Sequence, residues 1–189
     1  PGMTVVNPCD GAEMRAAVQA LIDYDGPAYL RLGRSAVETV TEYESGKHTF
    51  QLGKGVTLRE GKDVTIVATG MMVQLALQAA ELLAAEGIDA RVLDIHTVKP
   101  LDTELILKAA KETGAIVTSE EHSVIGGLGG AVAEFLSGHC PVPVIRHGVK
   151  DVFGRSGKAA EVLEAYGLTA EVLAKCARHA VEKKNGPKD

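Results

Sequence analysis

Short apolar runs alternate with longer segments of helical periodicity from Gly53 onward, and no other feature restricts the possible fold as strongly. Two of the helical segments stop at Gly87 and Gly114, and glycine readily adopts the left-handed conformation that ends a helix. Strands that alternate with helices of about 10 to 15 residues predict an α/β fold, a mostly parallel sheet between two layers of helices. Five strands are expected, over residues 56–59, 63–69, 90–95, 115–120 and 142–146, with helices over 74–86, 102–112, 126–136 and 173–181.

The first two of these strands are joined only by Glu60-Gly61-Lys62. A crossover between parallel strands needs about a dozen residues or more, so this hairpin-like connection is too short for one. The sequence therefore predicts one antiparallel strand at the edge of the sheet.

The first 34 residues form a smaller strand–helix–strand pattern. Residues 4–7 and 28–32 have strand character, and Asp10 is placed to cap a helix with Glu13 at the capping-box position. A unit of this size cannot bury a core of its own, because chains below roughly 40 residues usually need outside support. We interpret residues 1–34 as the remnant of a larger α/β domain and expect that the natural N-terminus, upstream of Pro1, is missing.

Residues 35–52 are polar and charged, as is typical of a linker. The predicted organisation is therefore a domain remnant over 1–34, a linker over 35–52 and a complete α/β domain over 53–189.

Composition excludes several classes of function. The net charge is −5 and the basic residues are scattered, which argues against a nucleic-acid surface. No apolar run approaches the roughly 20 residues that cross a bilayer, and no leader pattern is present. Cys9, Cys140 and Cys176 lack the CxxC spacing of zinc or redox sites, which suits structural thiols in a reducing compartment. We expect a cytoplasmic protein with neither nucleic acid nor membrane as partner.

Three stretches resemble the C-terminal domain of transketolases: VLDIHTVKPLD (92–102), SEEHSVIGGLGGAVAE (119–134) and the FG, SG and YGL elements within 153–168. Similar stretches occur in 1-deoxyxylulose-5-phosphate synthase and in the β subunits of 2-oxoacid dehydrogenases. IHTVKPLD and the last stretch are more similar to transketolases made as two separate chains. NPCD (7–10) and YLRLGR (29–34) resemble the end of the pyrimidine-binding domain of the same enzymes, so the resemblance covers essentially the whole chain.

The resemblance implies that the complete enzyme transfers two-carbon ketol units between sugar phosphates of the pentose phosphate pathway, with thiamine diphosphate and Mg²⁺. It also implies an N-terminal transketolase subunit as partner and a homodimeric assembly. The family's GDG metal motif and its asparagine pair do not occur in this sequence, and its coenzyme-activating glutamate would lie upstream of Pro1. A coenzyme depends on protein groups for position and electrostatics. We therefore expect this chain alone to hold no catalytic residue, bound coenzyme or metal, and to be inactive.

Arg34 is the one residue that the resemblance assigns to substrate, as the group that binds the sugar phosphate. A guanidinium is always charged and grips phosphate through a planar fork. The alternative is an ordinary exposed arginine at the end of a strand. The family often has an acidic residue between FG and SG, whereas this chain has Arg155.

The run Glu120-Glu121-His122 ends a predicted strand and could suggest a metal or acid–base site. Neighbouring side chains on a strand point to opposite faces, so the two glutamates cannot easily share a ligand. We expect these three residues to anchor loops or to contact another subunit.

The glycines within 126–130 could cradle an anion at a helix start, although close packing is the expected role because the dinucleotide spacing is not met. His96 and His147 have no companions at metal-ligand spacing and are assigned no metal.

Two alternatives to a transketolase segment stay open. One is an interaction module that docks other components, as in the β subunit of a 2-oxoacid dehydrogenase, which would need an exposed apolar patch. The other is a part of a 1-deoxyxylulose-5-phosphate synthase.

Overall fold

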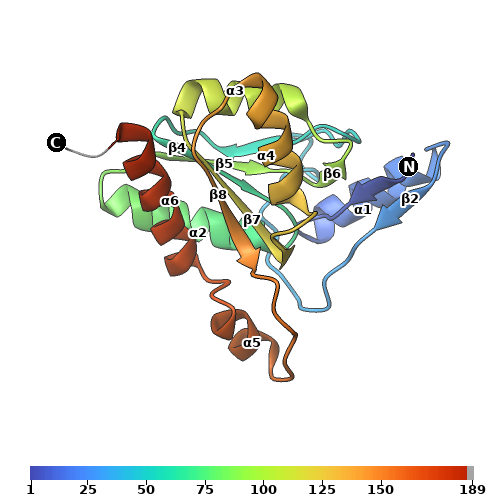
Figure 1. Ribbon diagram of the computed structural model, residues 1–189. Coiled ribbons are helices and arrows are strands. Elements are labelled where there is room, and N and C mark those ends of the chain that lie inside the picture. The colour runs from blue at the N-terminus through green and yellow to red at the C-terminus, as the bar shows by residue number, and fades with distance from the viewer. Residues whose placement is uncertain (187–189) are drawn as a thin grey trace.

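The computed structural model describes residues 1–186 and has a five-stranded sheet at its centre (Figure 1). The strands, in chain order, are β3 (Val56–Arg59), β4 (Val64–Ala68), β5 (Ala90–Asp94), β7 (Ile116–Ser123) and β8 (Val144–Val149). Their spatial order is β3-β5-β4-β7-β8, and all neighbours are parallel except β3 and β5. Every residue of β4 and β5 is buried, as expected for central strands of a parallel sheet covered on both faces. The predicted α/β fold class is confirmed.

Two pairs of helices cover the sheet and make three layers (Figure 1). Neighbouring residues of β4 serve opposite cores: Ile66 packs with α2 and α6, and Val67 with α3 and α4. This alternation follows from the two-residue period of a strand. The helices are α2 (Met72–Ala85), α3 (Thr103–Thr113), α4 (Leu128–His139) and α6 (Ala170–Asn185).

The antiparallel edge strand was predicted correctly. Its partner is not β4, the next strand in the chain, with which a hairpin would have paired it. β3 pairs with β5, and β5 lies between β3 and β4. The short connection therefore crosses over the start of β5, where Gly61 lies against the backbone of Ala90 and Arg91. Glycine is needed because no side chain fits between these two backbone segments.

A second, smaller sheet joins the N-terminal unit to the rest of the chain. β1 (Thr4–Val6) and β2 (Ala28–Leu30) pair in parallel, with α1 (Gly11–Ile22) between them in sequence. A third strand, β6 (Thr97–Lys99), follows β5 and adds to β1 in the antiparallel direction. The sequence did not predict β6, and this strand connects the two sheets.

The stretch 31–55 contains neither helix nor strand. A short helix that was not predicted, α5 (Ala159–Ala165), lies between β8 and α6. None of the helices within residues 1–186 is both long and apolar enough to cross a membrane.

Two glycine substitutions test the crossing of β5. A Cβ at position 61 would collide with the Ala90–Arg91 backbone, so Gly61→Ala should lower the free energy of unfolding by about 1–3 kcal/mol. Gly138→Ala in α4 meets open space and should raise it by roughly 0.5–1 kcal/mol through helix propensity. Urea denaturation of both variants measures these changes. Equal effects would contradict the crossing geometry.

Candidate functional site

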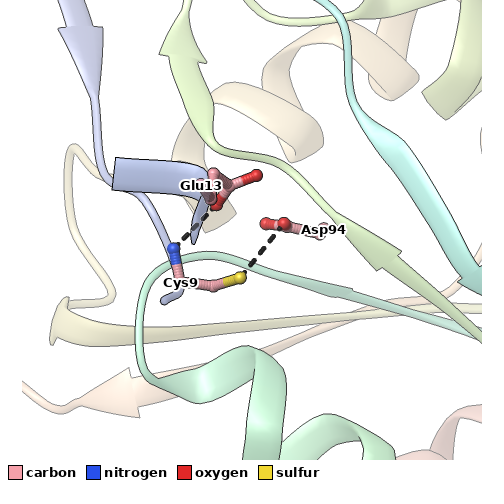
Figure 2. Close-up of side chains that lie close together, drawn as sticks. All are labelled: Cys9, Glu13 and Asp94. Carbon is pink, nitrogen blue, oxygen red and sulfur yellow. Dashed lines mark hydrogen bonds between the residues drawn. The ribbon is translucent and has the colours of Figure 1, made fainter. Parts of the chain in front are cut away.

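Three buried side chains meet where the N-terminal unit contacts the five-stranded sheet (Figure 2). Glu13 lies in the first turn of α1, Cys9 directly precedes the N-cap residue of that helix, and Asp94 ends β5. The Cys9 thiol donates a hydrogen bond to Asp94 Oδ2 (3.4 Å), and the Cys9 amide donates to Glu13 Oε2 (2.7 Å). This cluster therefore links α1 directly to the central sheet.

The carboxyl groups of Glu13 and Asp94 cannot both carry a charge in this environment. Burial, followed by the negative charge of Glu13 and a hydrogen bond to it, raises the pKa of Asp94 well above its usual range. Burial also raises the pKa of Glu13, although hydrogen bonds from Asp94, Cys9 and Tyr43 oppose this effect. The pKa of Asp94 is thus raised more clearly than that of Glu13, and Asp94 is the carboxyl group that stays protonated. Burial likewise raises the pKa values of the Cys9 thiol and the Tyr43 phenol, so both groups stay neutral.

The Cys9 sulfur and one carboxylate oxygen each of Glu13 and Asp94 lie within 4.8 Å of one another, which is close enough for the cluster to hold a metal ion. Its chemistry does not fit the Mg²⁺ of a thiamine enzyme, because Mg²⁺ takes oxygen ligands and keeps several waters. One donor here is sulfur, all three residues are buried, and the two oxygens of Glu13 already accept from the Cys9 amide and the Tyr43 hydroxyl. A shared proton accounts for the arrangement better than a cation does.

Asp10 organises the neighbouring backbone. Its carboxylate accepts from the Glu13 amide, as the predicted helix cap requires, and also from the amides of Val40 and Thr41, each at 2.8 Å. Burial disfavours the charge, but these hydrogen bonds outweigh it and lower the pKa of Asp10. Glu13 completes the cap through the Cys9 amide, one residue before the position expected in a capping box.

A cavity of about 700 Å³ lies beside this junction and is lined by Arg31, Arg34, Arg155 and Glu121 among other residues. Arg31 donates to the carbonyl oxygen of Glu121 (2.9 Å) and lies 3.8 Å from its carboxylate. Arg34 follows β2 and is exposed. The structure therefore brings Arg34, which was named from the sequence, into one cavity with the divergent Arg155.

The Glu120-Glu121-His122 run has its side chains on alternate sides, as strand geometry requires. Glu120 is buried and accepts from the amides of Leu128 (2.8 Å) and Gly129 (2.7 Å) at the start of α4. The glycine-rich segment thus already has a carboxylate at its helix N-terminus, which is the favourable place for a negative charge. Glu120 and His122 line a second cavity of about 560 Å³, whereas Glu121 faces the arginines.

The two histidines that were assigned no metal, His96 and His147, are held in structural contacts. His96 stacks on Phe50 with ring centroids 4.2 Å apart, and burial lowers its pKa to about 4. His147 bonds Ser119 and the Gly167 carbonyl, and burial lowers its pKa as well. Within residues 1–186, neither belongs to a group of three potential metal ligands.

Sequence reasoning did not identify Asp94 or Tyr43. The available signal for Asp94 was an acidic residue at the end of an otherwise buried strand. Tyr43 lies in the segment that was interpreted as a linker, where no periodic pattern indicates a contact.

A three-layer α/β domain joined to a small three-stranded sheet with one helix defines the class of protein. The family described as Transketolase, C-terminal domain, matches residues 53–173, and the chain belongs to this family.

Particular relatives are subunits of two-chain enzymes. The chain is 51% identical to the 6-deoxy-6-sulfo-D-fructose transketolase subunit SqwH of Clostridium sp. (strain MSTE9), covering 98% of this chain and 56% of that protein. It is 48% identical to a subunit of the apulose-4-phosphate transketolase of Phocaeicola vulgatus, covering 97% and 58%. A solved structure described as a split gene transketolase, inactive beta4 tetramer, superimposes with a TM-score of 0.92 at 51% identity, covering 96% of this chain and 58% of that one. The chain thus spans a little over half the length of these relatives.

The protonated Asp94 predicts a pH dependence of stability. The ordinary pKa of this group is 3.8 and its pKa in the folded chain is higher, so its stabilisation is complete below about 3.8. It is lost as the pH rises through the folded value, with a slope of up to about 1.4 kcal/mol per pH unit.

Asp94→Asn keeps a hydrogen-bond donor toward Glu13 but cannot ionise. Its free energy of unfolding should therefore fall less steeply than that of the natural chain between pH 5 and 8, as measured by urea denaturation. His96 and His147 titrate in both proteins, so the difference between the two curves isolates the carboxyl pair. Parallel curves would show that the pair shares no proton.

Proposed function

We propose that this chain is the C-terminal part of a transketolase made as two chains. The complete enzyme transfers two-carbon ketol units between anionic sugars. Two relatives that are about half identical to this chain are named as transketolase subunits, one for a sulfonated and one for a phosphorylated sugar. Both names specify a sugar with a charged group, which supports anionic sugars as the substrate class.

In this proposal, thiamine diphosphate and Mg²⁺ belong to the complete enzyme and are bound mainly by an N-terminal partner subunit. The buried Cys9, Glu13 and Asp94 cluster does not suit Mg²⁺, and the sequence contains no GDG motif. The coenzyme supplies the carbanion chemistry, whereas this chain supplies a rigid scaffold and substrate contacts. The solved relative described as an inactive tetramer of β chains supports the view that a C-terminal subunit alone does not catalyse the reaction.

Assembly and location belong to the same proposal. A symmetric dimer would repeat one surface on both copies, and the tetramer of the solved relative could arise from two such dimers. All three cysteines are free, which suits the reducing cytoplasm.

The observation that carries the substrate role is the position of Arg34. This residue lines an arginine-rich cavity next to the junction of the two units, and a guanidinium can bind a phosphate or sulfonate through two parallel hydrogen bonds. Arg34 would hold the charged end of the sugar and thereby orient its carbonyl end.

A 1-deoxyxylulose-5-phosphate synthase is the second candidate, because the enzyme of that name from Heliobacterium modesticaldum is 43% identical over 96% of this chain. That match covers 28% of the relative, compared with more than half of the two-chain transketolase subunits. Formation of 1-deoxyxylulose 5-phosphate by the complete enzyme, without ketol transfer, would favour this candidate.

Reconstitution tests whether this chain alone can catalyse ketol transfer. The 189-residue chain with thiamine diphosphate, Mg²⁺, and donor and acceptor sugar phosphates should give no ketol transfer. The complete two-chain enzyme, which includes the coenzyme-activating glutamate that this chain lacks, should give turnover, measured by chromatography of the product sugars. Turnover by the isolated chain would refute the proposal.

Substitution of Arg34 tests the substrate contact. In the complete enzyme, Arg34→Ala should raise KM for a phosphorylated sugar about tenfold or more, because a charged hydrogen bond is lost. Lys108→Ala, at an exposed position of α3 that does not line the cavity, is the matched control and should leave KM unchanged. An unaltered KM in Arg34→Ala would remove this residue from the site.

A further inference from the structure

The cavity that contains Arg34 has an excess of positive charge, although the whole chain has a net charge of −5. Two carboxylates also line it, and both are already engaged. Glu121 faces Arg31 at 3.8 Å, and Asp10 accepts hydrogen bonds from three backbone amides and a hydroxyl group. Within the described part of the chain, Arg34 and Arg155 have no carboxylate partner within 4 Å.

Arg155 is held in a defined orientation. Its guanidinium lies over the ring of Tyr166, 5.8 Å from the centroid, where the negative face of the ring attracts a cation. The Tyr166 hydroxyl in turn donates to the carbonyl oxygen of Phe153 at 2.8 Å. Tyr166 thus contacts the loop at two points and restricts its motion. The loop therefore loses less conformational entropy when an anion binds to Arg155.

The remaining polar groups near these two arginines are small donors. Ser35 follows Arg34, and Ser156 and Gly157 follow Arg155, and all three line the same cavity. Hydroxyl groups can donate to the oxygens of a tetrahedral anion while the guanidinium groups neutralise its charge.

The two arginines come from different units of the fold. Arg34 follows β2 of the small sheet, whereas Arg155 lies on the loop between β8 and α5. An anion between them would therefore contact both units at once.

We propose that Arg155 is a second anion-binding residue of this cavity and, together with Arg34, binds the phosphate or sulfonate group of the sugar. This inference rests on the proposed function and extends it to a residue that determines substrate specificity. The ligand chemistry is a tetrahedral oxyanion. A phosphate carries close to two charges at neutral pH and a sulfonate one, so two cations favour phosphate more strongly.

The experiment uses the complete two-chain enzyme with the variants Arg155→Ala and Arg155→Lys. Arg155→Ala should raise KM for a phosphorylated aldose about tenfold or more, and leave kcat/KM for a neutral aldose within twofold of the natural enzyme. Arg155→Lys should recover part of the loss, because it keeps the charge without the planar fork. Lys158→Ala, a substitution in the same loop at a side chain that is 88% exposed, should change neither value.

Inhibition separates the two possible anions. Inorganic phosphate and methanesulfonate should compete with the sugar, and both inhibition constants should rise in Arg155→Ala. A larger rise for phosphate indicates a phosphorylated sugar as the preferred substrate, and an equal rise indicates a singly charged group such as a sulfonate.

Three results would overturn the proposal. Arg155→Ala with an unchanged KM for the phosphorylated sugar would remove Arg155 from the site. Equal losses with charged and neutral aldoses would show a structural role only. Phosphate binding to the complete protein, measured by calorimetry, does not need the reaction, and equal binding by the natural protein and Arg155→Ala would reject Arg155 as an anion-binding residue.

Failure of the proposed function is a separate outcome, because it would appear as an absence of ketol transfer in the natural enzyme.

Discussion

The junction between the small sheet and the five-stranded sheet is the constraint on which the rest of the structure depends. β6 leaves the end of β5 and pairs with β1, while Asp94 at the end of β5 meets Glu13 and Cys9 of the N-terminal unit. Backbone pairing and the hydrogen bond from the Cys9 thiol to Asp94 thus join the units at neighbouring points. Arg34 and Arg155 belong to opposite sides of this junction, so their shared cavity exists only because the junction holds.

Charge is distributed unevenly around the junction. On its buried side, negative charge is removed by protonation of Asp94 or balanced by backbone amides, as at Asp10 and Glu120. On its open side, two guanidinium groups stay without carboxylate partners among residues 1–186. Buried carboxyl groups that are already satisfied contribute to stability, whereas uncommitted cations at a cavity can bind an anionic ligand. In the function that we propose, these cations would bind the charged group of the substrate.

Small residues determine how closely the segments of this fold approach. Gly61 lets the connection between β3 and β4 cross the backbone of β5, and Gly127 leaves room for the carboxylate of Glu120 at the start of α4. Both are positions where a methyl group would meet occupied space. These close contacts fix the edge of the sheet and the loop that lines the second cavity.

The sequence by itself determined the class of fold, the main strands and helices, and the cap at Asp10, because periodicity and capping depend on residues that are near in the chain. The substrate role proposed for Arg34 comes from the resemblance, and the loop or subunit contacts expected for the Glu120-Glu121-His122 run come from strand geometry. Only the tertiary structure decided the partner of β3, the existence of β6, and the meeting of Asp94 with Glu13. These features depend on contacts between residues far apart in sequence. β6 is three residues long and becomes a strand because β1 offers hydrogen bonds. Asp94 keeps its proton because folding removes water from around it.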